Sequence, residues 1–297
     1  MTIKQIVAIL TLLIFGIAVS LAGNQKRKAS IPAQKLFGVQ KSAAAMSPQA
    51  FGSYAKGCLA GSQQLAADGA SWQAMRLSRN RNWGHPDLVD YIARLAQDAQ
   101  QLDGWPGLLV GDMAQPRGGP MLTGHKSHQI GLDVDIWLMP ANGHKFTLKE
   151  RENVSAISVR KDNFTLNQKI WTPNHAQLIK RAVSYPEVAR VFVHPTIKRE
   201  LCQWAGNDRG WLNKVRAWYG HHYHFHVRLK CPDGSSNCKN QAAPPAGDGC
   251  GKELDWWLST AAYKPAPKKP KEPKKPKKRE LTLADLPSAC EAVLLAP

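Results

Sequence analysis

Two short clusters of histidines constrain this chain more than any other feature of its sequence. The first is G-H-K-S-H-Q-I-G-L-D-V-D at residues 124–135, and the second is H-H-Y-H-F-H at residues 221–226. The alternation around the second cluster predicts a β-strand, which would place His222, His224 and His226 on one face. Imidazoles two residues apart on a strand can converge on one point, so we expect a polar site here.

This density of histidines beside aspartates is typical of a metal site. Zinc prefers imidazole nitrogen, thiolate sulfur and carboxylate oxygen, and a catalytic site keeps three protein ligands with the fourth position open. Two histidines and one aspartate satisfy that count. The alternative is a pair of exposed polar turns with buried, hydrogen-bonded histidines. Cysteine ligands are less suitable, because the chain has no C-x-x-C pair, and Cys231 and Cys238 suit a small disulfide loop.

The N-terminal residues predict export. Lys4 precedes an almost unbroken apolar run over residues 6–22, and Ser20-Leu21-Ala22 offers the small-x-small pattern that signal peptidase requires. We therefore expect a signal peptide at residues 1–22. An uncleaved anchor is the alternative, because a run of about 17 residues approaches the length that spans a bilayer.

Charge and cysteine number agree with an exported protein. Forty Lys and Arg against 22 Asp and Glu give a net charge of +18, which predicts an anionic partner such as nucleic acid, a membrane or a cell wall. The six cysteines are an even number, which suits three disulfides in an oxidising compartment.

The composition divides the chain into one mixed α+β domain with extensions. Residues 23–50 predict an extended arm, and residues 51–263 form the domain. Residues 264–280 hold eight Lys and one Arg against two Glu among prolines, which predicts a solvated linker, either a spacer or an electrostatic tether. Residues 281–297 contain Cys290 and are expected to dock back on the domain. Periodicity predicts a helix from Pro86 ending by Gly104, helices over residues 173–183 and 196–204, and strands over residues 108–110, 134–138, 191–193 and 223–229.

The motifs resemble those of the penicillin-insensitive murein endopeptidase family of LAS-type zinc metallopeptidases. S-H-Q-I-G-L-D-V-D-I at residues 127–136 matches the family's zinc motif, a His and an Asp with six residues between them, and Y-H-F-H-V-R-L at residues 223–229 matches its downstream His-x-His. Further similarity runs through R-N-W-G-H-P at residues 81–86, and the likeness covers residues 50–263. It implies a single α+β domain with a small antiparallel sheet, flanking helices and long loops, stapled by disulfides.

The resemblance implies a ligand set. His128, Asp135 and His226 would hold one catalytic zinc ion. His125 would be an extra ligand, and Asp162 falls where some family members bind a second ion.

The catalytic roles follow from the same likeness and from chemistry. His224 would act at the zinc-bound water and His221 would assist it, because the sequence has no H-E-x-x-H helix to supply a glutamate base and the pKa of histidine lies near working pH. Asp133 is either a carboxylate that orients a histidine ring or an acceptor for loop N–H groups.

The resemblance also implies the disulfide pairing, which the spacing alone leaves open. It pairs Cys58 with Cys290, Cys202 with Cys250, and Cys231 with Cys238.

These features together predict an exported zinc metalloendopeptidase of the Gram-negative periplasm. The resemblance implies that it hydrolyses the D-alanyl-meso-diaminopimelyl cross-bridges of peptidoglycan during wall remodelling. It would escape β-lactams because these acylate a serine that a zinc site does not offer. We expect peptidoglycan as the partner rather than nucleic acid, with contact between the basic linker and anionic wall or lipid. The alternatives are a D-Ala-D-Ala carboxypeptidase, a non-catalytic wall-binding module and a metal-storage protein.

Overall fold

The computed structural model describes residues 31–264 and 279–297, and a six-stranded mixed sheet lies at its centre. The strand order is β4-β6-β7-β10-β8-β9, and the pairs at the two edges, β4 with β6 and β8 with β9, are parallel. The middle of the sheet is antiparallel. The strands are β4 (Trp72–Ala74), β6 (Leu108–Val110), β7 (Asp133–Trp137), β10 (His224–Leu229), β8 (Val188–Val193) and β9 (Val215–Ala217).

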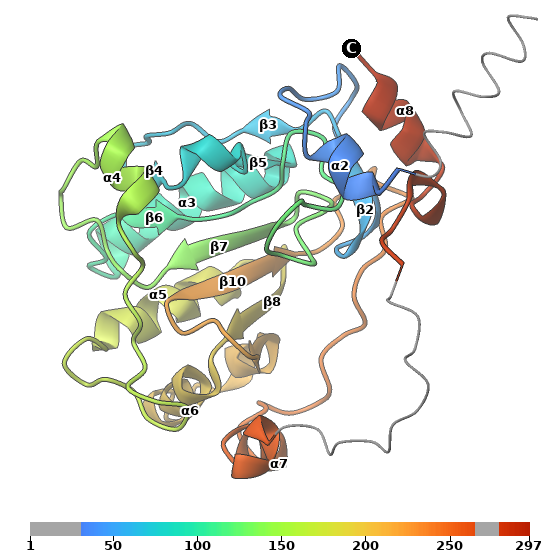
Figure 1. Ribbon diagram of the computed structural model, residues 1–297. Helices are drawn as coiled ribbons and strands as arrows, with labels where there is room; N and C mark the ends of the chain where they lie inside the picture. Colours follow the sequence, from blue (N-terminus) through green and yellow to red (C-terminus); the bar gives the residue numbers. More distant parts are fainter. Residues whose placement is uncertain (1–30, 265–278) are drawn as a thin grey trace, which may run out of the picture.

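Two long helices cover one face of this sheet. The helix α3 (Pro86–Leu102) begins at a proline after the His85 cap, whose side chain accepts a hydrogen bond from the backbone of Asp87. The helix α5 (Pro173–Ser184) packs against α3 and β8, behind the sheet in Figure 1. Apolar side chains on one stripe of each helix enter the main core. Three shorter helices follow α3 along the chain: α4 (Leu148–Asn153), α6 (Pro195–Trp204) and α7 (Lys252–Trp257).

A second, smaller core joins the two ends of the described chain. The helices α2 (Ala33–Phe37) and α8 (Ala289–Leu295) lie side by side against the hairpin of β1 (Gln49–Ser53) and β2 (Lys56–Ala60) (Figure 1). Phe37 is fully buried there. The prediction of an extended arm over residues 23–50 is therefore wrong for residues 33–37, because apolar partners from the far end of the chain stabilise a helix that has no periodicity of its own.

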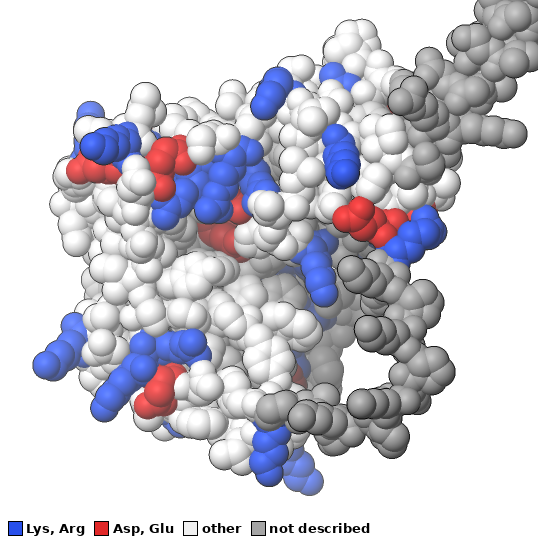
Figure 2. Space-filling view, in the orientation of Figure 1, with Lys and Arg blue, Asp and Glu red and all other residues white. Residues whose placement is uncertain are grey.

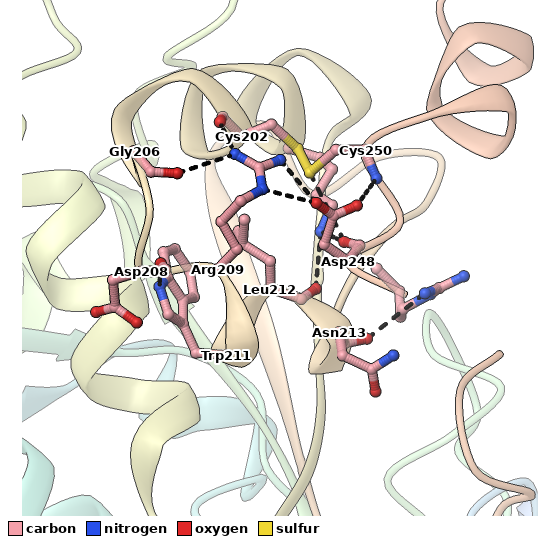
Figure 3. The surroundings of a disulfide bond; sticks show 11 residues. Cys202, Gly206, Asp208, Arg209, Trp211, Leu212, Asn213, Asp248 and Cys250 are labelled. Carbon is pink, nitrogen blue, oxygen red and sulfur yellow. Dashed lines mark hydrogen bonds and ion pairs between the residues drawn. A yellow bond between two sulfur atoms is a disulfide. The ribbon is translucent and has the colours of Figure 1, made fainter. Parts of the chain in front are cut away.

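Three disulfides are present, in the pairs that the resemblance implied. Cys58–Cys290 fastens α8 to β2, and Cys231–Cys238 closes a short loop after β10. Cys202–Cys250 joins the end of α6 to the segment before α7, where Arg209 Nε also donates a hydrogen bond of 2.8 Å to Asp248 Oδ2 (Figure 3). The docking expected for residues 281–297 is thus present in the structure.

The predicted helices and strands of the α+β domain are confirmed. The shorter elements were not predicted, because no sequence pattern indicates them. The sheet has parallel strand pairs at both edges and is therefore not wholly antiparallel. The signal peptide at residues 1–22 and most of the linker lie outside the described residues. Of the helices that the structure describes, none combines the length and apolar character that crossing a membrane requires. The other short elements are β3 (Gln63–Gln64), β5 (Trp83–Gly84), and the 3-10 turns Leu77–Arg79, Gly210–Lys214, Thr260–Tyr263 and Leu283–Asp285.

Candidate active site

Pairing of β7 with β10 brings the two histidine clusters together. In this antiparallel pair His226 lies opposite Asp135, and Arg228 lies opposite Asp133. Because side chains alternate along a strand, Phe225, Val227 and Leu229 enter the core on the helix side of the sheet. The polar residues between them face the other side. All of these polar side chains are nevertheless buried, under the loop that precedes β7.

That loop, residues 124–131, carries the remaining ligand candidates. His128 is fully buried and has a positive φ of 67°, a conformation that is uncommon for a residue with a side chain. Its backbone N–H donates a hydrogen bond of 2.9 Å to Asp133 Oδ2, which fixes the turn. Gly131 also has a positive φ, of 69°, and a Cβ there would meet the His85 nitrogen at 2.9 Å. The loop is therefore held tightly against the sheet.

Three of these side chains form a group that can hold a metal ion. His125, His128 and Asp135 each offer a ligand atom, and these atoms lie within 4.8 Å of one another. His128 Nε2 lies 3.6 Å from Asp135 Oδ1. Both ring nitrogens of His128 and Asp135 Oδ1 are buried without a hydrogen bond to any described residue. Unpaired buried polar atoms are rare, and here they point at one another.

His226 joins this group through Asp135 and is oriented by Asp133. Its Nε2–H donates a hydrogen bond of 3.0 Å to Asp133 Oδ1, and its Nδ1 lies 3.1 Å from Asp135 Oδ1. Asp133 also accepts a hydrogen bond of 2.8 Å from Arg228 Nε. Burial opposes a charge on each group, but Arg228 and His226 lower the pKa of Asp133 overall, and the two aspartates raise the pKa of His226 to about 9.

His224 and His221 lie beside the ligand group. His224 Nε2 is 3.6 Å from Asp135 Oδ1, and its ring centre is 4.9 Å from that of His221. His221 occupies the turn before β10, where its Nδ1–H donates a hydrogen bond of 2.7 Å to the carbonyl of Tyr219. Burial lowers the pKa of both histidines, and in His221 the neighbouring His224 adds to the effect, giving a pKa of about 3. Both rings are therefore neutral at pH 7.

The structure does not bring every predicted residue to this site. His222, expected on one face with His224 and His226, precedes the strand, because β10 begins only at His224, and its Nδ1 contacts Ser158 Oγ at 2.9 Å. Asp162 lies in an exposed turn, where its carboxylate accepts hydrogen bonds from the backbone of Phe164 and Thr165. The metal group found among the described residues does not include Asp162.

Asp112, which follows β6, belongs to this site but was not among the residues predicted from the sequence. Its Oδ2 lies 3.1 Å from His125 Nε2, 3.0 Å from Arg81 Nη1 and 3.2 Å from Arg79 Nη1. Burial opposes its ionisation, but the hydrogen bond from His125 and the arginines lower its pKa to about 2. An acid two residues after a short apolar strand was the signal that could have indicated it.

Two hollows flank the histidines. Figure 2 shows basic side chains gathered above the centre of one face of the molecule, with acidic ones among them. The smaller hollow, about 300 Å³, lies between Arg76, Asp112 and His224. The larger, about 630 Å³, is lined by His221, His226 and the aromatic rings of Phe192 and Trp218. His125 borders both. An extended substrate could therefore lie across the histidines with one arm in each hollow.

Comparison with known proteins gives one consistent result. A family profile described as penicillin-insensitive murein endopeptidase matches residues 50–295. The protein of that name from Haemophilus influenzae is 48% identical over 219 residues, which is 72% of this chain and 76% of the relative. Its namesake from Yersinia enterocolitica is 43% identical over 249 residues, 84% of this chain and 86% of the relative. A third, from Klebsiella pneumoniae, is 41% identical over 252 residues, with the same coverage of 84% and 86%.

Proposed function

This chain belongs to the penicillin-insensitive murein endopeptidase family, and from that membership we propose that it is an exported, zinc-dependent endopeptidase of the cell wall. Its substrate is the peptide cross-bridge of peptidoglycan, and the bond it cuts joins D-alanine to meso-diaminopimelate. The observation that carries the proposal is the group of buried ligand atoms on His125, His128 and Asp135 within 4.8 Å of one another, in which neither ring nitrogen of His128 has a hydrogen-bond partner among the described residues.

The donor set at this position fits zinc. His128, Asp135 and His226 offer two imidazoles and one carboxylate, the number and kind of ligands that a catalytic zinc site uses. Since Asp133 engages His226 Nε2, Nδ1 is the nitrogen available for the ion. His125 is the fourth candidate, and it borders both hollows. Zinc supplies Lewis acidity toward the scissile carbonyl and the attacking water.

The histidines of β10 and its preceding turn move the protons. His224 is neutral at pH 7, so its ring can accept a proton from the attacking water. His221 donates Nδ1–H to Tyr219, so its Nε2 is a free acceptor beside His224, and we assign to His224, assisted by His221, the transfer of that same proton from the attacking water to the leaving amine. Asp112 holds His125 and Asp133 holds His226, so both carboxylates act by positioning a ring. None of these steps requires a serine nucleophile, which accounts for insensitivity to penicillin.

The location follows from the substrate. A cell-wall enzyme works outside the cytoplasm, and residues 1–22 are the signal peptide, or an uncleaved anchor, that delivers it to the periplasm. The partner is peptidoglycan rather than nucleic acid. Contact of the basic linker with anionic wall or lipid belongs to the same proposal.

Digestion of purified cross-linked muropeptide dimers, read by mass spectrometry, tests this function. Conversion of dimers to monomers is expected with the zinc-loaded protein, and not after chelation or with His128→Ala. Release of terminal D-alanine alone would make the protein a carboxypeptidase instead. Zinc binding by wild type without any product would favour a binding or storage role.

A further inference from the structure

Three arginines from three adjacent strands line the larger hollow. Arg190 lies on β8, Arg216 on β9 and Arg228 on β10, and the sheet order places these strands side by side. Arg190 and Arg228 are direct cross-strand partners. Like charges opposite each other on neighbouring strands repel, so the fold holds this arrangement against a cost.

Two of the three charges are neutralised within the protein. Arg228 is paired with Asp133 at 2.8 Å, and Arg216 is paired with Glu253. Arg190 is different: its Nη2 donates a hydrogen bond of 2.6 Å to the carbonyl of Ala242, and no carboxylate of the described residues lies within ion-pair distance. Burial and the charges of Arg216 and Arg228 lower the pKa of Arg190. With Lys126, the lining has four basic side chains and one carboxylate.

The position of Arg190 relative to the histidines is fixed. Its guanidinium carbon lies 6.0 Å from the ring centre of Phe192, and that ring is 5.3 Å from the ring of His226. Ala242, which holds the guanidinium, lies in the segment between Cys238 and Cys250, so a disulfide anchors each end of that segment. A charge held this rigidly beside a hollow is preorganised to bind an anion.

We infer that Arg190 binds the carboxylate that stays free on the diaminopimelate side of the scissile bond. This inference rests on the proposed function, because it names the part of that substrate which the larger hollow receives. In a D-alanyl-meso-diaminopimelyl bond the acylated amine and a free carboxylate share one carbon. A guanidinium with most of its five N–H groups uncommitted can bind such a carboxylate through two parallel hydrogen bonds. The rings of Phe192 and Trp218 would contact its methylene chain.

The test pairs a change in the protein with a change in the substrate. Wild type, Arg190→Gln and Arg190→Lys are assayed on dimers with that carboxylate free or converted to its amide. Amidation is expected to raise the KM of wild type about tenfold to a hundredfold with a smaller change in kcat. Arg190→Gln should show the same loss on the free acid and no further loss on the amide, and Arg190→Lys should fall between. Arg94→Gln removes an equal charge from an exposed position on α3 and should behave as wild type.

An unchanged KM in Arg190→Gln, or a full penalty for amidation in that variant, would overturn the inference. Calorimetric titration of the metal-free proteins with a D-alanyl-meso-diaminopimelate peptide separates it from the proposed function. If wild type cuts no dimers but binds this peptide in an Arg190-dependent way, the proposed function fails and the inference holds. If Arg190→Gln binds the peptide as wild type does, the inference fails whatever the activity.

Discussion

The histidine site and the corner around Lys198 both bury charged or polar side chains, but they treat them in opposite ways. Lys198 is 1% exposed, and its Nζ donates hydrogen bonds of 2.8 Å and 2.6 Å to the carbonyls of Leu212 and Asp248. His128 is equally buried, yet neither ring nitrogen has a partner among residues 31–264 and 279–297. A buried polar group without a partner destabilises the fold by about 1–3 kcal/mol. The hydrogen bonds of Lys198 therefore stabilise the fold. The unpaired nitrogens of His128 lower the free energy of unfolding, and a bound ion can offset that loss.

Replacement of His128 by alanine sharpens this contrast most. We expect kcat/KM on muropeptide dimers to fall at least about 10³-fold, because a metal ligand is lost. The metal-free variant should lose less than about 2 kcal/mol of unfolding free energy relative to metal-free wild type, because the unpaired buried nitrogens that disappear with the ring offset part of the packing that is lost. Urea unfolding in the presence of a chelator measures this, and a larger loss would contradict it.

Removal of the Cys202–Cys250 disulfide should lower stability and leave catalysis nearly unchanged. The double variant Cys202→Ser with Cys250→Ser is expected to lose about 2–4 kcal/mol of unfolding free energy, because the bond closes a loop of 48 residues. Its kcat should stay within about twofold of wild type at a temperature where it is folded, since no ligand is touched. A variant of full stability, or one that is folded but inactive, would show that the two regions are not separate.

Asp133→Asn tests a carboxylate of the site that has several hydrogen-bond partners. Asp133 serves His226, Arg228 and the His128 backbone, so the neutral amide should weaken zinc affinity about 10- to 100-fold. Competition with a coloured chelator gives the affinity. Asp112→Asn is the matched comparison, because His125 is the one histidine of the site that Asp112 contacts, and a larger effect there would reverse the ranking of the two carboxylates.

The last prediction concerns how the stability of the region around Lys198 depends on pH. Burial lowers the pKa of Lys198 to about 7, so between about pH 7 and 10 the unfolded chain binds a proton that the folded chain lacks. This contribution to the stability of wild type should rise with pH across that window, by at most about 1.4 kcal/mol per pH unit. Lys198→Met should lack the rise. Parallel stability curves for the two proteins, from urea unfolding at each pH, would contradict the shift.

The helices and strands with strong hydrophobic periodicity could be predicted from the sequence. Elements that form only through contacts with distant segments could not. Pro86 and the apolar stripe that follows it were enough to predict α3. The strand β10 was also predicted, but not its first residue, because the left-handed turn at His221, with a φ of 51°, delays the pairing and takes His222 away from the site.

The small core and the surroundings of the ligands could not be predicted from local patterns. Phe37 is buried in a cluster that includes α8, at the other end of the chain, and Gly119 lies against its ring, so no window around Phe37 contains the whole reason for the helix. Asp112 acts through contacts with three residues from different segments, and no motif marks it. The motif of a His and an Asp with six residues between them indicated His128 and Asp135, because both lie within one short stretch of sequence.

The Cys58–Cys290 disulfide joins residues 232 apart in the sequence, and this imposes an order on how the molecule is completed. Until residue 290 is present, the small core lacks the apolar side chains of α8, and Cys58 has no thiol to pair with. Arg117 also lacks acceptors until then, because its Nη1 donates hydrogen bonds to the carbonyls of Val293, Leu294 and Ala296. A chain that stops early therefore exposes apolar surface and a reactive thiol, the features by which proteases and chaperones recognise unfinished proteins. The small core of α2, α8 and the β1–β2 hairpin is therefore complete only in a chain that extends through α8.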